Sequence, residues 1–164
     1  MSHDLICLVG YSRSGKDYTA NLIQSWFEDY QKFALADFTK RLFSLILSVD
    51  VNDFEKEKEV YRDRLIEVHE EMIKRVDRNF FVKDFFLNYY TEGCPWIISD
   101  VRFYHEMDYI KSKVENAYFI YVTRPNAEIN TKCGQEIHPA GCDMLFVNND
   151  KQEDMLREEL ERIL

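Results

Sequence analysis

Near the N-terminus, two glycines and a lysine have the spacing of a loop that binds phosphate groups. Four residues separate Gly10 from Gly15, and Lys16 follows directly. Glycines let the backbone curl so that several N–H groups point at one anion, and a lysine at this place reaches the β- and γ-phosphates of a nucleotide. An ordinary turn with a surface lysine is the alternative. The spacing favours a polyphosphate site contacted by Gly10, Arg13, Ser14, Gly15, Lys16, Asp17 and Tyr18.

The residues on either side of this loop indicate a strand before it and a helix after it. The apolar run Leu5–Val9 suits a buried strand. Beyond the loop, the side chains at 19, 22, 23 and 26 recur at helical spacing. A helix that starts at the loop directs the positive end of its dipole at the bound anion.

Asp17 stands where such loops usually carry a hydroxyl residue that binds Mg²⁺. A carboxylate is a hard oxygen ligand, so it suits Mg²⁺ directly or through a water. The alternative is purely structural, because an acidic residue in the first turn of a helix is favourable for the helix dipole. The sequence leaves both readings open.

Composition limits what else the chain can do. A chain of 164 residues, 46% hydrophobic and with five glycines and three prolines, predicts one folded domain over 1–164. A net charge of −9 disfavours binding to nucleic acid or to anionic membranes. The sequence shows neither a membrane-spanning run nor a leader, and its four cysteines suit a reducing compartment. We therefore expect a cytoplasmic protein, either a monomer or a homodimer, with small-molecule partners.

Strand and helix patterns alternate along the chain. Four further strands are expected at 32–36, 96–99, 118–122 and 144–147, with helices at 38–49, 61–76, 80–90, 104–113 and 152–163. The segment 38–49 is apolar almost throughout, which predicts a buried helix. This alternation predicts an α/β three-layer sandwich with a five-stranded parallel sheet and helices on both faces. Ligands in such folds bind beyond the carboxyl ends of the strands.

The residues that follow the expected strands are polar or charged. Asp37 and Lys40 follow the second strand one helical turn apart, Asp100 and Arg102 follow the third, and Arg124 follows the fourth. A solvent-exposed polar residue at the end of any one strand is ordinary. All of them together, with arginine and lysine prominent, indicate a site for anions.

Three segments resemble the bacteriophage-type deoxynucleoside monophosphate kinases. They are SRSGKD at 12–17, ADFTK at 36–40 and SDVRFYHE at 99–106, and the likeness spans nearly the whole chain in the family's order. The resemblance implies a P-loop kinase-like fold with a helical acceptor region at about 37–92 and a short lid at about 125–142. It implies transfer of the γ-phosphate of ATP to a deoxynucleoside 5′-monophosphate, with Mg²⁺ as cofactor.

The chemistry of such a transfer assigns a role to each cluster. Lys16, Arg102 and Arg124 are the expected catalytic cations, and Asp17 and Asp100 are the expected metal ligands. For Asp100 the alternative is to orient Arg102, and for Arg124 it is an ordinary surface ion pair. The acceptor is expected to contact Asp37, Lys40, Arg64, Arg75 and Arg102, with Arg78 as a further candidate.

Two other functions compete with this hypothesis. The animal-type phosphomevalonate kinases share the loop and an Asp-x-Arg strand end, so a non-nucleotide phosphate is the rival acceptor. A nucleotide-dependent switch without transfer activity is the second rival. In the lid, Cys133, His138 and Cys142 could in principle hold zinc, but their spacing fits no strong template, which favours inert residues.

Overall fold

A single parallel sheet positions the phosphate loop, with strand order β2-β3-β1-β4-β5. The computed structural model describes residues 5–48, 50–56, 58–125, 134–149 and 152–164. The strands are β1 (Leu5–Val9), β2 (Gln31–Phe33), β3 (Trp96–Val101), β4 (Ala117–Thr123) and β5 (Met144–Val147). The expectation of a five-stranded parallel sheet with helices is confirmed.

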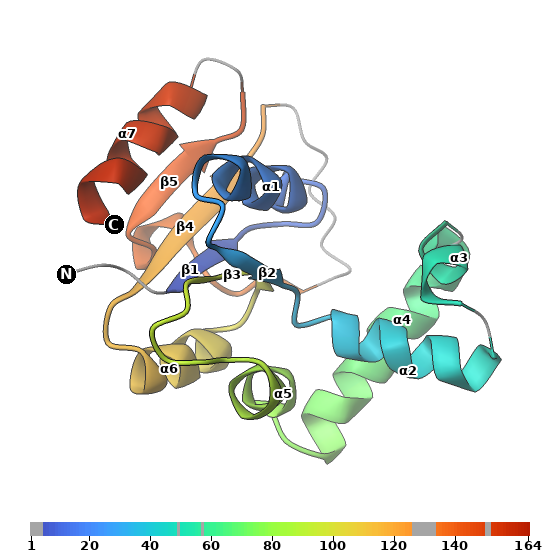
Figure 1. The fold of residues 1–164 in the computed structure, drawn as a ribbon. Helices are drawn as coiled ribbons and strands as arrows, with labels where there is room; N and C mark the ends of the chain where they lie inside the picture. Colours follow the sequence, from blue (N-terminus) through green and yellow to red (C-terminus); the bar gives the residue numbers. More distant parts are fainter. Residues whose placement is uncertain (1–4, 49, 57, 126–133, 150–151) are drawn as a thin grey trace.

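Helices cover both faces of the sheet, as the sequence predicts (Figure 1). One face carries α1 (Lys16–Trp26) and α7 (Glu153–Ile163), and the other carries α5 (Phe80–Asn88) and α6 (Tyr104–Lys113). A short 3₁₀ turn, η2, spans Pro139–Gly141. None of the helices in the described part of the chain is both long and apolar enough to cross a bilayer.

The alternation of side chains along the central strand creates two cores. All five residues of β1 are fully buried. Leu5, Cys7 and Val9 belong to the core beneath α5 and α6, while Ile6 and Leu8 belong to the core beneath α1 and α7. Successive side chains of a strand point to opposite faces, so a strand that is covered twice must be apolar throughout.

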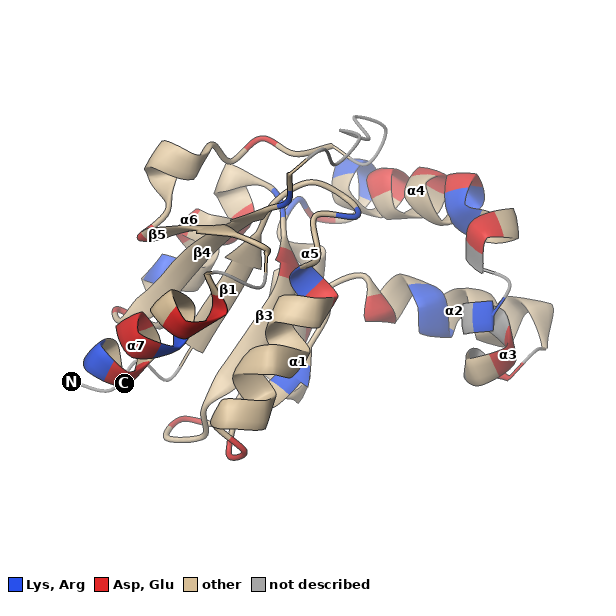
Figure 2. Cartoon of the chain, turned by 90° about the horizontal axis from the view of Figure 1, so that it is seen from above, with Lys and Arg blue, Asp and Glu red and all other residues tan. Residues whose placement is uncertain are grey.

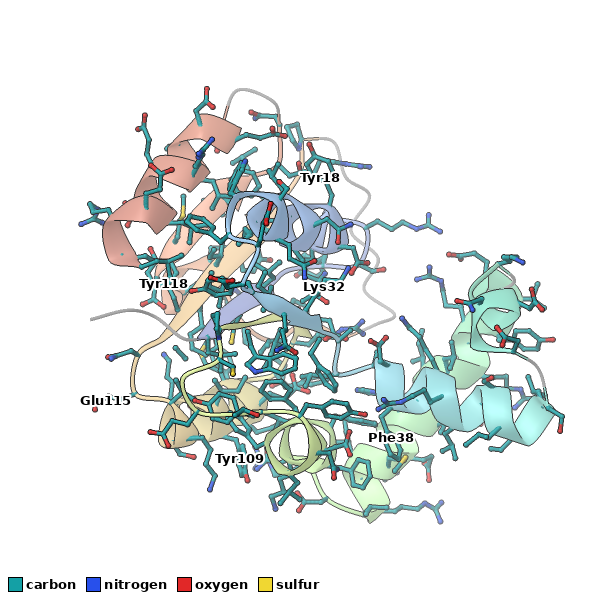
Figure 3. All side chains as sticks on the ribbon, in the orientation of Figure 1. Tyr18, Lys32, Phe38, Tyr109, Glu115 and Tyr118 are labelled. Carbon is teal, nitrogen blue, oxygen red and sulfur yellow. The ribbon has the colours of Figure 1, made fainter. Side chains whose placement is uncertain are left out.

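Three helices extend beyond the edge of the sheet: α2 (Asp37–Leu47), α3 (Val51–Lys56) and α4 (Lys58–Arg75) (Figure 1). Phe38 fixes the start of α2 by packing its ring 5.0 Å from that of Phe80 on α5, and Figure 3 shows it between the two helices. The prediction of a buried helix at 38–49 is wrong for its far end. Leu45 is 78% exposed and Ile46 is 67% exposed, because α2 there lies past the sheet.

Candidate active site

A cavity of about 550 Å³ lies at the carboxyl ends of the strands, and α2 and α4 form its outer wall. Its basic residues come from the phosphate loop, α1, α2, α4 and the ends of β3 and β4. Seen from above, basic segments lie on the side of the sheet that faces α2 and α4 (Figure 2). The charged residues of the lining are Arg13, Lys16, Asp17, Lys40, Arg62, Glu70, Asp100, Arg102 and Arg124.

The glycines of the phosphate loop are required by close contacts. Gly10 has φ 140°, and a Cβ there would lie 2.3 Å from the carbonyl oxygen of Val122. Gly15 has φ 97°, and a Cβ would lie 1.8 Å from the Asn148 Nδ2. That amide donates to the Ser14 carbonyl oxygen at 3.4 Å, so the end of β5 braces the loop. Any side chain at either glycine would displace this arrangement.

Lys16 is folded into the curl of the loop. Its Nζ donates to the carbonyl oxygens of Gly10 and Tyr11, both at 2.6 Å, and the residue is only 8% exposed. Ser14 Oγ is buried beside it and bonds to none of the residues that the structure describes. The loop therefore holds an ammonium group where a phosphate is expected to bind.

Asp100 ties the end of β3 to the start of the helical arm. One carboxylate oxygen accepts from the Leu35 N–H at 2.6 Å, and the other accepts from the Ala36 N–H at 3.0 Å. Burial raises the pKa of Asp100, while the Arg102 guanidinium opposes this shift. The carboxylate thus has a structural role that the sequence did not reveal, and it also lines the cavity.

The turn after β3 carries Arg102 and is fixed by a buried carboxylate. Glu106 is 3% exposed, and its Oε2 accepts from the N–H groups of Arg102 at 2.9 Å and Phe103 at 3.1 Å. Burial raises the pKa of Glu106 to about 7. From the end of β4, which lies on the other side of β1, Arg124 reaches the same cavity without an ion pair to any described residue.

The helical arm contributes one basic residue that was expected and one that was not. Lys40 lines the cavity and pairs with Asp37 at 2.9 Å. Arg62 also lines it, donates to Ser12 Oγ of the phosphate loop at 3.3 Å, and is paired with Glu59. Arg62 therefore connects α4 to the phosphate loop.

Six expected contact residues do not line the cavity: Gly10, Ser14, Tyr18, Asp37, Arg64 and Arg75. Arg64 is 73% exposed and pairs with Glu67, and Arg75 pairs with a glutamate of its own helix. Tyr18 donates to the Glu153 carboxylate at 2.7 Å, and Figure 3 shows it on the outer part of α1 near α7. Arg62, rather than Arg64 or Arg75, is therefore the arginine of α4 that faces the cavity. Arg78 does not line the cavity either.

The cavity-facing residues of α4 form a regular series that the sequence contains. Arg62, Leu65, Ile66, His69 and Glu70 recur at spacings of three and four, which place them on one helix face. Sequence reasoning followed the apolar residues Tyr61, Leu65, Val68, Met72 and Val76 of the same helix, which share only Leu65 with this face. Extending the helical pattern from Arg62 would have identified this face.

His69 is the least expected member of this face. Its ring stacks on Phe81 with centroids 3.9 Å apart and planes at 1°, and its Nδ1 lies 3.3 Å from Thr39 Oγ1. Burial, assisted by the Arg102 charge, lowers the pKa of His69 to about 4. The imidazole is therefore neutral at neutral pH.

Half of the expected lid, residues 126–133, lies outside the described residues, and Cys133 is among them. The remainder is attached to the site: the N–H groups of Glu136 and Ile137 donate to the Arg102 carbonyl oxygen at 3.0 and 3.4 Å. Burial raises the pKa of the Cys142 thiol to about 11, which disfavours the thiolate that zinc requires. Of the three candidate zinc ligands, His138 and Cys142 are among the residues that the structure describes.

Two carboxylates of the cavity fit a magnesium ion. Asp17 and Asp100 both line it, and each offers the hard oxygen ligands that Mg²⁺ prefers. Within the described ranges no group of three or more metal-ligating side chains occurs. Magnesium bound with a nucleotide needs only one or two carboxylates, since phosphates and waters supply the other ligands.

Comparisons with known proteins agree with this geometry. The family model for phosphomevalonate kinase matches residues 8–116. No curated protein matches the chain significantly. Shikimate kinase from Aquifex aeolicus is similar in structure, with a TM-score of 0.51 and 13% identity over 96% of this chain and 94% of that one. TT1252 from Thermus thermophilus gives a TM-score of 0.50 and 13% identity over 100% of both chains. At such low identity these structures support the fold alone.

Proposed function

We propose that this chain, which belongs to the phosphomevalonate kinase family, transfers the γ-phosphate of ATP to the phosphate of a deoxynucleoside 5′-monophosphate. Family membership makes it a kinase with a P-loop fold, and the acceptor is the part that we infer. The observation that carries the inference is the composition of the cavity wall on α4, which is cationic beside the phosphate loop and neutral or acidic further away.

The basic end of the cavity suits two phosphate groups held end to end. Its six cations are Arg13, Lys16, Lys40, Arg62, Arg102 and Arg124. ATP and a monophosphate together bring about six negative charges, which must be held close together for transfer. Binding of a nucleotide alone needs fewer cations, so this number favours a transferase over a nucleotide-dependent switch.

The far end of the cavity has a different character. Glu70 lies about two turns, or ~12 Å, further along α4 than Arg62. Beside it are the apolar side chain of Ile66 and the neutral ring of His69. This end suits a flat, uncharged group that carries N–H donors, which describes a nucleobase.

Each residue then has a defined task in the transfer. Lys16 and the N–H groups of the phosphate loop hold the β- and γ-phosphates of the donor. Arg102 lies where the two phosphates meet, and its interaction strengthens as charge shifts between them. Lys40 holds the acceptor phosphate, and Arg124 approaches the transferring group from β4. Bound Mg²⁺, held by Asp17 and Asp100, would offset the charge of the triphosphate.

Phosphomevalonate is the second candidate acceptor, because the matching family model bears its name. That molecule carries a carboxylate at the end remote from its phosphate. In this cavity the remote end would approach Glu70, so the two negative charges would repel each other. The same cation cluster would still serve its phosphate.

Coupled ADP release from ATP, measured with a panel of acceptors, tests the proposal. We expect turnover with deoxynucleoside monophosphates, tried first with those of thymine and guanine, and slow release of inorganic phosphate without an acceptor. Turnover with phosphomevalonate and with no nucleotide would overturn the acceptor while leaving the kinase assignment intact. Rapid hydrolysis that no acceptor affects would favour the switch.

Two variants separate donor binding from acceptor binding. Lys40→Ala should raise the KM for the monophosphate by a much larger factor than the KM for ATP. Arg102→Ala should instead lower kcat, because its contact forms mainly in the transition state. An equal effect of both variants on the KM for ATP would contradict these roles.

A further inference from the structure

His69 is a neutral, oriented side chain in the cavity that phosphate chemistry does not use. It lies on α4 one full heptad beyond Arg62, so it is remote from the phosphate loop. We propose that His69 determines acceptor specificity by hydrogen bonding, through Nε2, to the edge of the acceptor's base. This inference rests on the proposed function and names the side chain that reads the base.

Two contacts hold the imidazole in one orientation. Its face is stacked on Phe81, which is 2% exposed and belongs to the core beneath α5 and α6. Its Nδ1 lies 3.3 Å from the hydroxyl of Thr39, which is also 2% exposed. Within the described part of the chain, Nε2 has no hydrogen-bond partner. A fixed ring with one engaged nitrogen leaves the other to recognise a ligand.

Burial and the Arg102 charge keep the ring neutral. Charged groups that line the same cavity include Lys40 on α2, Arg62 and Glu70 on α4, and Asp100 and Arg102 at the end of β3. Burial and Arg102 lower the pKa of His69, so the ring has one N–H donor and one acceptor nitrogen at neutral pH. A protonated imidazole would attract an anionic group, whereas the neutral ring distinguishes hydrogen-bond patterns.

Glu70, the next residue on α4, completes the recognition surface. Its carboxylate only accepts hydrogen bonds, and it lines the same end of the cavity. Nε2 and this carboxylate together match a base edge that presents an acceptor beside an N–H donor. An acceptor without a base leaves Nε2 of the half-buried His69 unpaired, which is a source of discrimination, whereas the exposed Glu70 remains hydrated.

Deoxyribose 5-phosphate provides the test, because it has the phosphate and sugar of the acceptor but no base. The measurement is the ratio of kcat/KM for a deoxynucleoside monophosphate to that for deoxyribose 5-phosphate, in the wild type and in His69→Phe. Phenylalanine keeps the stack on Phe81 and removes both nitrogens. We expect the ratio to fall at least tenfold. The KM for ATP and the kcat/KM for deoxyribose 5-phosphate should change little.

Further variants distinguish a loss of base recognition from a loss caused by misfolding. Thr39→Val frees the ring from its hydrogen bond and should lower the ratio less than His69→Phe does. His69→Gln retains a polar end without the stack and should keep part of the ratio. Glu67→Gln, on the outer face of α4 where Glu67 pairs with Arg64, should leave it unchanged.

The possible outcomes distinguish the two proposals. If the wild type phosphorylates nucleotides and His69→Phe keeps the wild-type ratio, the role of His69 is overturned while the kinase assignment stands. Equal losses for both acceptors would show a structural role only and would also overturn it. If the wild type phosphorylates no nucleotide, the acceptor proposal itself fails, and the assignment of His69 fails with it.

Discussion

The assignment of Arg62, rather than Arg64, to the phosphates can be tested on one helix. Arg62 lines the cavity and contacts the phosphate loop, whereas Arg64 is 73% exposed and pairs with Glu67. Residues two positions apart on a helix point in nearly opposite directions, because each residue turns the chain by about 100°. Arg62→Ala and Arg64→Ala therefore remove the same charge from opposite faces of α4.

The expected size of the effect follows from the contacts. A hydrogen bond between Arg62 and a charged phosphate contributes about 1.5–3 kcal/mol. Binding requires Arg62 to release Glu59, and that partly exposed pair offsets up to about 1 kcal/mol. The remaining 0.5–2 kcal/mol, roughly, corresponds to a loss of about 2- to 30-fold in kcat/KM. For Arg64→Ala, loss of an exposed pair predicts a change of about twofold or less.

The assay is coupled ADP release, with ATP and the acceptor varied separately for both variants. Thermal unfolding provides the control for folding, and both variants should unfold near the wild-type temperature. A larger loss of kcat/KM in Arg64→Ala than in Arg62→Ala would refute the placement of α4 against the phosphate loop. Equal small losses would refute the contribution of Arg62 to phosphate binding.

Three further predictions concern the donor site, the metal and a buried carboxylate. Lys16→Met should lower kcat/KM at least ~100-fold in the ADP-release assay without changing the circular dichroism spectrum, because its charge serves the phosphates; near-normal turnover would contradict the kinase assignment. EDTA should abolish activity and Mg²⁺ restore it, and Asp17→Ala should raise the Mg²⁺ concentration for half-maximal rate; an unchanged requirement would leave the metal to Asp100. Glu106 has its pKa raised from 4.5 to about 7 by burial, so its contribution to stability is lost as pH rises through this range. Glu106→Gln should therefore gain stability relative to the wild type between pH 5 and pH 8, by up to about 3 kcal/mol, as measured by denaturant unfolding; a constant difference would show that Glu106 does not titrate there.

The sequence predicted the sheet well because its strands follow local patterns. β1 and β5 have the predicted bounds, and α6 spans the predicted residues. β2 is the exception, because its pairing ends at Phe33 whereas the apolar run continues through Leu35 and Ala36. The backbone N–H groups of those two residues bond to Asp100 instead of extending the strand. Because Asp100 is distant in sequence from Leu35 and Ala36, these hydrogen bonds could not be predicted from the local sequence pattern.

The acceptor side was predicted less well because it depends on how α2 and α4 are placed. The sequence correctly indicated helices there, but an arginine on a charged helix can face ligand or solvent. The contacts of Arg62 with Ser12 and of Glu59 with Arg13 show which face of α4 turns toward the phosphate loop. Likewise, the apolar residues at the end of α2 correctly predicted a helix but wrongly predicted that it is buried. Burial requires a neighbouring element to pack against, and the sequence pattern does not show whether one is present.

This difference explains how one kinase fold can serve different acceptors. The donor site is built into the sheet: Gly10 lies against the Val122 carbonyl, and Gly15 lies against Asn148. Changes there disturb β4 and β5 as well as phosphate binding. The acceptor wall belongs to helices that extend past the sheet (Figure 1), so its cavity-facing side chains, apart from the His69 ring stacked on core residue Phe81, can change with little effect on the two cores. The family match therefore constrains phosphoryl transfer more strongly than the acceptor, and in our proposal the identity of that acceptor depends on the α4 face from Arg62 to Glu70.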